Sequence, residues 1–363
     1  MKSFAKRFVD KVIETKIFGK LFWFGSLYLE YYVPSYLSSK WQQEHVSGNF
    51  RKSTGENVAL VDGLRDNIKP GWRSMLCAPT DLKLPSVQNL IQNLAHWRNR
   101  IDQVTSFLST HDFSISGKNV LEIGTFDGAT AYALAEAGAA SVIGTDLAQY
   151  YINQTPDSIV SADTIALKNR ELEVLRLSYH QVVENDIARR VSFQDDDICS
   201  STVLPDSMDF IFSWEVLEHL TRPLLAFEHM FKILKPGGVV FHEYNPFFSI
   251  AGGHSLCTLD FLWGHARLSD SDFERYLEEV RPNEMLLDLA FYRNNLNRMT
   301  FADLNDCALS AGFKIISVIP WSKRIHLELV TKEILDECKE NYPNLEITDL
   351  ISPTVWLLLQ KNI

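Results

Sequence analysis

The sequence predicts an α/β fold with a mostly parallel sheet and helices on both faces. Residues 120–146 have the pattern of a buried strand, a glycine turn, a helix and a second strand that ends in an acid. Further apolar strands follow within residues 191–198, 204–220 and 234–246. Strands that alternate with helices are typical of a parallel sheet. Of the 363 residues, 46% are hydrophobic, which is ample for a packed core.

The first strand–turn–helix unit has the features of a nucleotide-binding site. The strand 120–123 is followed by Gly124 and Gly128, which open the turn into an alanine-rich helix. A ligand at such a turn meets backbone N–H groups and a helix N-terminus. Asp146 ends the second strand about 20 residues beyond the first glycine, where an acid typically contacts ribose hydroxyls.

The same turn disfavours NAD. A dinucleotide fingerprint needs a glycine where this chain has Phe126, because the backbone must approach the pyrophosphate. Glu122 and Asp146 would in addition repel a diphosphate, whereas they suit a cofactor that carries an ammonium and a sulfonium. The turn therefore favours an adenosine cofactor with positive charge.

These motifs resemble the class I methyltransferases that use S-adenosylmethionine. The arrangement E-x-G-x-x-x-G with its acid is followed, in that family's order, by VSFQDDDI at 191–198, LPDSMDFIFSWEVLEHL at 204–220 and LKPGGVVFHEYNP at 234–246. A helix and two further strands lie in residues 298–363. The resemblance covers 110–245 and 298–363, and it implies a Rossmann-like sheet of seven strands, the last one antiparallel and in a hairpin with the sixth.

The resemblance also implies which residues bind S-adenosylmethionine. Asp197 and Ile198 occupy the adenine positions, and Ser213 faces the methionine part. Asp195 and Asp196 fit a solvated acidic loop. The full predicted set is Glu122, Gly124, Thr125, Phe126, Gly128, Asp146, Leu147, Asp197, Ile198 and Ser213.

Two regions lie outside the resemblance. Residues 1–109 are predicted to be a helical extension and lead-in, with loops at 41–72 and one or two helices at 84–109. Residues 110–363 form the methyltransferase domain, interrupted by a cap insertion at 246–297. The insertion leaves a strand at its carboxyl end, so it should cover the crevice where such sheets bind ligands. We expect its many aromatic residues to form mainly its own core, and we expect it to supply the acceptor site.

Residues 1–24 are basic, amphipathic and aromatic. Such a helix can lie on an anionic membrane surface, or it can pack its apolar face on the catalytic domain, which we favour slightly. The chain has no apolar run of 18 residues, so we expect no transmembrane span. A secretory signal is not expected either, because Gly25 and Ser26 interrupt the apolar stretch.

Methyl transfer from a sulfonium needs mainly an acceptor held in line with the methyl group. A hydroxyl acceptor must also lose its proton, and a histidine suits that task. His254, after a Gly-Gly pair that we expect to be a flexible hinge, and His265, beside Trp263, are the predicted bases or orienting donors, and His219 is the next candidate. Any one buried histidine is more often structural.

Glu215, Glu218 and His219 lie at a spacing that can place them on one helix face. A similar E-x-x-E-H occurs in some metal-assisted O-methyltransferases, which bind a divalent cation with it and a distant histidine. That resemblance implies a site completed by His254 or another cap histidine. Many metal-free relatives keep the Glu-His pair of this motif for helix capping and packing. We therefore expect activity without a metal.

Charge and cysteine content exclude other classes. The net charge of −11, with no basic patch in the catalytic half, argues against a nucleic-acid substrate. Five scattered cysteines indicate neither disulfides nor zinc, which fits a cytoplasmic protein. We expect an O-methyltransferase for a small molecule or a carbohydrate or lipid precursor. The alternative is a non-catalytic S-adenosylmethionine-binding or scaffold protein of the same fold. Oligomeric state is not predicted.

Overall fold

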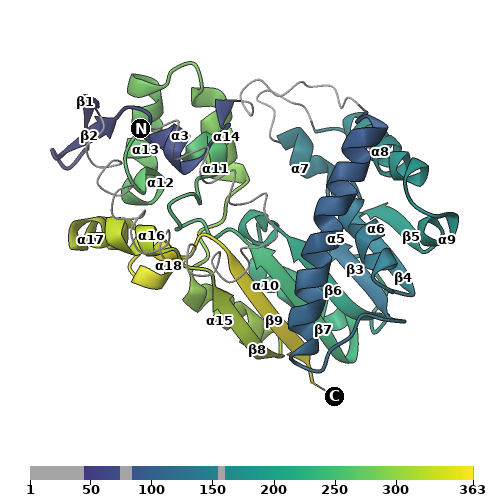
Figure 1. Ribbon diagram of the computed structural model, residues 1–363. Helices are drawn as coiled ribbons and strands as arrows, with labels where there is room; N and C mark the ends of the chain where they lie inside the picture. Colours follow the sequence, from purple (N-terminus) through teal and green to yellow (C-terminus); the bar gives the residue numbers. More distant parts are fainter. Residues whose placement is uncertain (1–44, 74–83, 154–159, 363) are drawn as a thin grey trace, which may run out of the picture.

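The computed structural model describes residues 45–73, 84–153 and 160–362, and its centre is a seven-stranded sheet (Figure 1). The strand order is β5-β4-β3-β6-β7-β9-β8, and β9 runs antiparallel to the other six strands. The predicted Rossmann-like fold is confirmed. The strands are β3 (Asn119–Ile123), β4 (Ser141–Asp146), β5 (Val191–Asp195), β6 (Met208–Trp214), β7 (Leu234–Tyr244), β8 (Phe313–Pro320) and β9 (Val355–Lys361).

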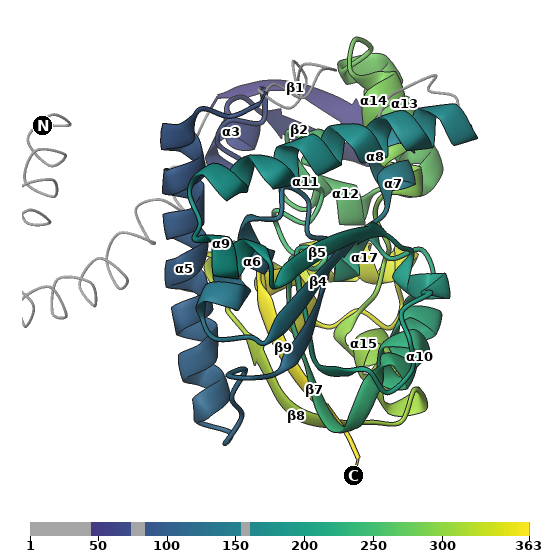
Figure 2. The same ribbon diagram turned by 90° about the vertical axis from the view of Figure 1, so that its right-hand side faces the viewer.

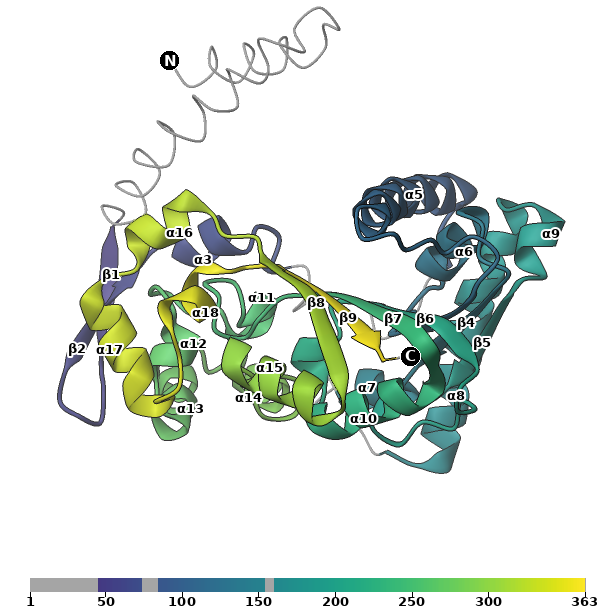
Figure 3. The same cartoon turned by 90° about the horizontal axis from the view of Figure 1, so that it is seen from below.

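Helices cover both faces of the sheet, as expected, and each face has its own apolar core (Figure 3). On one side lie α5 (Val87–Ser109), α6 (Ala129–Glu136) and α9 (Asn185–Ala188), and on the other α10 (Pro223–Ile233) and α15 (Phe301–Ser310). The lead-in helix predicted at 84–109 is the single helix α5. Ser86 caps its N-terminus, because the Ser86 hydroxyl accepts a hydrogen bond from the Asn89 N–H at 3.2 Å.

The strand order reverses between β3 and β6, so a crevice opens at their carboxyl ends, where ligands bind in open α/β sheets. Two helices after β4, α7 (Ala148–Asn153) and α8 (Ala162–Leu177), lie over this edge (Figure 2). The turns after β3, β4, β5 and β6 therefore meet around one site.

The cap insertion folds into four short helices around its own core. They are α11 (His254–Cys257), α12 (Gly264–Arg267), α13 (Asp270–Val280) and α14 (Met285–Asn294). Eight of its aromatic side chains are buried in one cluster: Phe247, Phe248, Phe261, Trp263, Phe273, Tyr276, Phe291 and Tyr292. The expectation that these rings form mainly a core is confirmed.

Two segments that we did not assign to the cap pack into the same cluster. The prediction of a loop at 41–72 is wrong. Residues 46–61 form a hairpin of β1 (Val46–Arg51) and β2 (Asn57–Val61), and α3 (Leu64–Ile68) follows it. Its apolar residues Phe50, Val58 and Leu60 are buried in the cap core. The glycine and asparagine residues among them obscure the alternation of apolar and polar residues by which strands are predicted from sequence.

The second segment lies between β8 and β9, which are antiparallel as predicted but are not joined by a tight turn. It holds α16 (Arg324–Leu329), α17 (Lys332–Asn341) and α18 (Ile347–Ile351). Leu329, Cys338 and Leu350 are buried in the cap core. The domain boundaries proposed from sequence remain a prediction.

The amphipathic stretch 1–24 lies outside the described residues, as does Cys77. In the part that is described, the four cysteines are free, in agreement with the sequence. No helix within that part is long and apolar enough to cross a membrane.

Candidate active site

A cavity of about 890 Å³ opens at the carboxyl edge of the sheet, above the strand-order reversal. One part is lined by the turns after β3, β4 and β5, and the other by the turn after β6, by α5 and by the cap. Of the residues predicted from sequence, the cavity walls contain Glu122, Gly124, Thr125, Phe126, Asp146, Leu147, Asp197, Ile198, His219 and His254.

The turn after β3 has a backbone that requires glycine. Gly124 and Gly128 have φ angles of 75° and 84°, in the left-handed region. A Cβ atom on Gly124 would lie 2.3 Å from a Val216 methyl, and one on Gly128 would lie 2.7 Å from the Phe193 ring. Gly128 thus shapes the turn without lining the cavity. Phe126 also has a positive φ of 41°, and its ring is half exposed at the cavity wall.

Asp146 fixes this turn to the next strand. One carboxylate oxygen accepts hydrogen bonds from the Phe126 N–H at 2.7 Å and the Tyr151 hydroxyl at 2.9 Å, and it pairs with Arg176 at 3.3 Å. The other oxygen accepts from the Leu147 N–H at 2.9 Å. Burial raises the pKa of Asp146, while the Arg176 charge opposes that rise. The carboxylate therefore has one oxygen with a single donor at the cavity wall.

Glu122 is the second acid of this region, and it is fully buried at the end of β3. Its carboxylate accepts a hydrogen bond from the Thr125 hydroxyl at 2.8 Å. Burial raises the pKa of Glu122 to about 8. A cation that enters the cavity here would favour loss of the proton.

The turn after β5 carries three acids with different roles. Asp195 is exposed and accepts from the Ala148 N–H, outside the cavity lining. Asp196 and Asp197 both line the cavity, so the solvated-loop prediction is wrong for Asp196, which is buried. Asp197 caps the 3₁₀ turn Ile198–Ser200, accepting from the Cys199 N–H at 2.8 Å.

The far end of the cavity brings together Glu218, His219 and His254. Their nearest ligand atoms all lie within 4.8 Å of one another. Glu218 is on the 3₁₀ turn Leu217–His219 after β6, rather than on a helix face, while His254 begins α11 of the cap. The Glu218 Oε2 and His254 Nε2 atoms are buried and have no hydrogen-bond partner. The cluster therefore offers free oxygen and nitrogen atoms to a ligand.

Burial controls the protonation of this cluster. It lowers the pKa of His219 and lowers that of His254 well below its usual value, so both rings are neutral at pH 7. Burial raises the pKa of Glu218 to about 8. His219 Nδ1 lies against the Asn295 carbonyl, which can only accept, so Nδ1 carries the proton and Nε2 is free to accept one.

The segment after α14 holds the turn of the cluster in place. Asn297 donates from its side chain to the carbonyls of Leu217 at 2.6 Å and Leu220 at 3.1 Å. Its backbone N–H donates to the Glu218 carbonyl at 2.8 Å. The cap thus positions both sides of the cluster.

Three sequence-predicted residues lie outside the cavity walls or outside the cluster in the structure. His265 is buried in the cap core and donates from Nε2 to the Phe247 carbonyl at 2.8 Å. Ser213 points to the opposite side of β6 from Trp214, because side chains alternate along a strand, and its hydroxyl lies 2.6 Å from His242 Nδ1. Glu215 lines the cavity but is outside the cluster, and it accepts from the Asn245 side chain at 3.0 Å.

The glycines before His254 also differ from expectation. We predicted a flexible Gly-Gly hinge. A Cβ on Gly252 would lie 2.0 Å from the Phe247 carbonyl oxygen, and one on Gly253 would lie 2.6 Å from the Cys257 backbone. These glycines allow close packing of backbone segments.

Sequence reasoning missed one wall of the cavity, formed by α5. Asn93, His96, Trp97 and Arg100 lie on that wall, and Arg100 pairs with Glu243 of β7. Trp97 packs edge-on against Trp214 of β6, with ring centroids 5.6 Å apart. The helical spacing of polar and aromatic residues at 93, 96, 97 and 100 was a signal that could have identified this face.

Comparison with known proteins gives the same family as the geometry. A family model described as a methyltransferase domain matches residues 94–318. The ubiquinone biosynthesis O-methyltransferase of Acinetobacter baylyi is 24% identical over 201 residues, which cover 54% of this chain and 71% of the relative. The mitochondrial ubiquinone biosynthesis O-methyltransferase of Dictyostelium discoideum is 28% identical over 127 residues, 35% of each chain. The chain thus spans about a third of that relative.

Among solved structures, phosphoethanolamine N-methyltransferase 2 of Haemonchus contortus with S-adenosyl-L-methionine is similar at 19% identity and a TM-score of 0.42, covering 85% of this chain and 62% of that one. An S-adenosylmethionine-dependent methyltransferase of Mesorhizobium loti has 13% identity and a TM-score of 0.41, with 70% and 96% covered. The family model spans more than half of the chain. The chain therefore belongs to the methyltransferase domain family and is a class I S-adenosylmethionine-dependent methyltransferase.

Proposed function

We propose that this protein transfers the methyl group of S-adenosylmethionine to a hydroxyl oxygen of a small molecule bound beside Glu218, His219 and His254. The observation that carries the proposal is this cluster, which places a carboxyl group and two neutral imidazoles in the cofactor cavity. Similarity to ubiquinone biosynthesis O-methyltransferases supports oxygen as the acceptor atom.

The first part of the cavity would hold the cofactor. The turn around Gly124 faces the methionine part, Glu122 accepts its ammonium, and the less occupied oxygen of Asp146 accepts a ribose hydroxyl. Asp197 and Ile198 border the adenine. His219 and His254, which line the other end of the same cavity, would then face the methyl group.

The second part of the cavity would orient and deprotonate the acceptor. The acceptor oxygen attacks the methyl carbon as the carbon–sulfur bond breaks, and S-adenosylhomocysteine leaves. The hydroxyl proton passes to an imidazole nitrogen, for which His219 Nε2 and His254 Nε2 are available. Because Glu218 is buried and both histidines are partly buried, little water competes for that proton.

The direct test is turnover with tritium-labelled S-adenosylmethionine and a panel of hydroxylated probes, beginning with catechol and 3,4-dihydroxybenzoate and including simple sugars. We expect label in the methyl ether of at least one probe. Cofactor binding without transfer to any probe would favour the alternative, a non-catalytic binding or scaffold protein. Tighter binding of NAD than of S-adenosylhomocysteine would contradict the assignment.

A second candidate is metal-assisted transfer at the same cluster. One carboxylate and two neutral imidazoles form a donor set that suits a divalent cation such as Mg²⁺ or Zn²⁺. The unpartnered Glu218 Oε2 and His254 Nε2 atoms favour it. A bound cation would orient the acceptor oxygen and lower the pKa of its hydroxyl. Of the ligand set predicted from sequence, Glu218, His219 and His254 come together in the structure, whereas Glu215 lies outside the cluster.

Metal binding can be tested without an acceptor. We expect Co²⁺ to bind the wild-type chain and to be lost in Glu218→Gln, whereas Glu215→Gln, outside the cluster, keeps it. Affinity should rise with pH up to about 8, because Glu218 must lose its proton first. Turnover that survives EDTA would support the metal-free mechanism expected from sequence, and loss restored by Mg²⁺ or Zn²⁺ would support the second candidate.

Cofactor binding should release a proton near pH 7. Glu122, with its pKa raised to about 8, is protonated in the free protein, and the cofactor's ammonium favours the carboxylate. Calorimetry of S-adenosylhomocysteine binding in phosphate and in Tris should therefore give enthalpies that differ with the buffer. Glu122→Gln should remove this difference. Equal enthalpies for the wild type would show that Glu122 does not meet the ammonium.

A further inference from the structure

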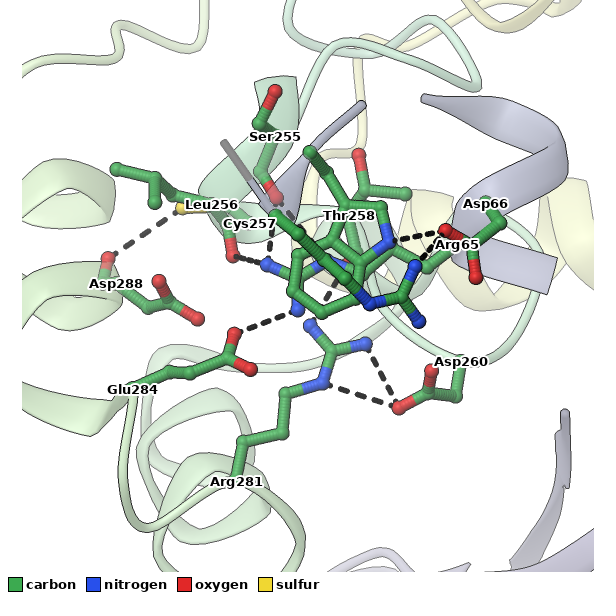
Figure 4. A network of polar contacts seen from close by, with 12 residues as sticks. Arg65, Asp66, Ser255, Leu256, Cys257, Thr258, Asp260, Arg281, Glu284 and Asp288 are labelled. Atoms are coloured by element: carbon green, nitrogen blue, oxygen red, sulfur yellow. Dashed lines mark hydrogen bonds and ion pairs between the residues drawn. The ribbon is translucent and has the colours of Figure 1, made fainter. Parts of the chain in front are cut away.

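Arg65 is a buried cation that the sequence analysis did not single out. It lies on α3, in the segment before the sheet, and only 2% of its surface is exposed (Figure 4). A charge in such a place needs hydrogen-bonding partners, and α3 obtains them from the cap, which follows it by about 190 residues. Its position therefore links two distant parts of the chain.

The partners of Arg65 lie directly beside the cluster. Its Nε and Nη2 atoms donate to the Ser255 carbonyl at 3.1 and 2.6 Å, and Nη2 also donates to the Leu256 carbonyl at 3.3 Å. These are the two residues after His254, in the first turn of α11. The guanidinium thus holds the short helix that begins with the cavity histidine.

The backbone of His254 explains why such support is needed. Its φ is 53°, a conformation that non-glycine residues adopt only when their surroundings impose it. α11 is only four residues long, so it has little intrinsic stability. Contacts outside the helix must therefore keep the His254 ring near His219, where the ring centroids are 5.1 Å apart.

Arg65 is itself held from three sides. Its Nη1 donates to Glu284 at 2.6 Å, and its guanidinium stacks 3.6 Å from the centre of the Trp72 ring. The nearby Arg281 pairs with Asp260 and donates to the Thr258 carbonyl at 2.9 Å, which fixes the other end of α11. Two buried arginines, Arg65 and Arg281, therefore hydrogen-bond to backbone carbonyls at both ends of α11 (Figure 4).

We propose that Arg65 is a positioning residue for His254, through which the segment before the sheet completes the active site. Arg65 is not among the residues that line the cavity. Its role is to orient the carbonyls of Ser255 and Leu256, and so the histidine. The segment before the sheet would then contribute to catalysis by holding His254 in place. This inference rests on the function proposed above for His254.

The test uses the full chain with Arg65→Lys and Arg65→Ala. Lysine keeps the charge next to Glu284 but lacks the fork that reaches both carbonyls. In the wild type we expect a nuclear Overhauser contact between the His219 and His254 rings. Both variants should lose it, and turnover should fall about 10- to 100-fold with unchanged S-adenosylhomocysteine affinity. Millimolar guanidinium should restore both in Arg65→Ala.

Arg267→Ala is the matched control, because Arg267 also binds a carboxylate and a carbonyl, those of Glu337 on α17 and of Leu262 in the cap, away from the cavity. It should keep the ring contact. In a double variant with His254→Ala, removal of Arg65 should cause no further loss of turnover. If Arg65→Ala does not fold, the ring contact and the turnover of Arg65→Lys test the proposal.

A folded Arg65→Lys that keeps the ring contact would overturn the proposal. So would a further loss in the His254→Ala background. Normal turnover of His254→Ala itself would instead refute the function proposed for His254. The ring contact would still report whether Arg65 positions it, so the two failures are distinguishable.

Discussion

Replacing His254 by alanine should lower the rate of methyl transfer by about 10²- to 10⁴-fold, the usual contribution of a positioned acid or base. The affinity for S-adenosylhomocysteine should hardly change, because the adenosine contacts that we propose come from the turns after β3, β4 and β5. Steady-state rates with a labelled methyl donor, together with calorimetry, measure both quantities.

His265→Ala is the control for this variant. His265 is in the same cap but is buried in its core, so its loss should reduce thermal stability and leave turnover per folded molecule unchanged. If His254→Ala keeps near-normal turnover, then His219 is the remaining candidate base. A drop in cofactor affinity and stability together would make His254 a packing residue.

The rate of the wild type should also depend on pH in a defined direction. Burial holds the pKa of His254 well below 6.5, so the ring stays neutral as the pH falls through that value. The acidic limb of the rate profile should therefore lie below pH 6.5. A limb centred at or above 6.5 would contradict a buried histidine base.

Asp146→Ala should weaken S-adenosylhomocysteine binding by about 1.5–3 kcal/mol, through the loss of charge-assisted hydrogen bonds. In dissociation constants this is roughly 10- to 150-fold. The structure adds a cost in stability, because the Phe126 and Leu147 N–H groups and the buried Arg176 would lose their acceptor. Calorimetry and thermal unfolding separate the two effects.

Asp195→Ala is the control for Asp146. Asp195 lies opposite Asp146 in the parallel pairing of β4 and β5, but it is exposed and outside the cavity walls. Its removal should leave cofactor affinity unchanged. Equal losses for the two variants would mean that general negative charge, rather than contact with Asp146, attracts the cofactor.

Several elements were fixed by local signals in the sequence. The strands around residues 120, 143 and 211 are short apolar runs, and buried parallel strands need no other pattern. Gly124 and Gly128 made the turn after β3 predictable. Both have φ angles that other residues avoid. The acid after the second strand was predictable because strand, helix and strand set its distance from the turn. Of the ten cofactor residues predicted from these signals and from the family resemblance, eight line the cavity.

The tertiary structure alone decided the acceptor end of the site. His254 lies 35 residues after His219 in sequence, and only the packing of α11 against the turn after β6 brings their rings together. Nothing local distinguishes His254 from His265, which the same cap buries away from the cavity.

The hairpin at 46–61 and Arg65 also gave no sequence signal, since their partners are residues of the cap. Sequence determined the sheet and the cofactor turn because contacts between neighbours in the chain form them. The acceptor site depended on contacts between distant segments, and those exist only once the cap, the lead-in and the sheet have packed together.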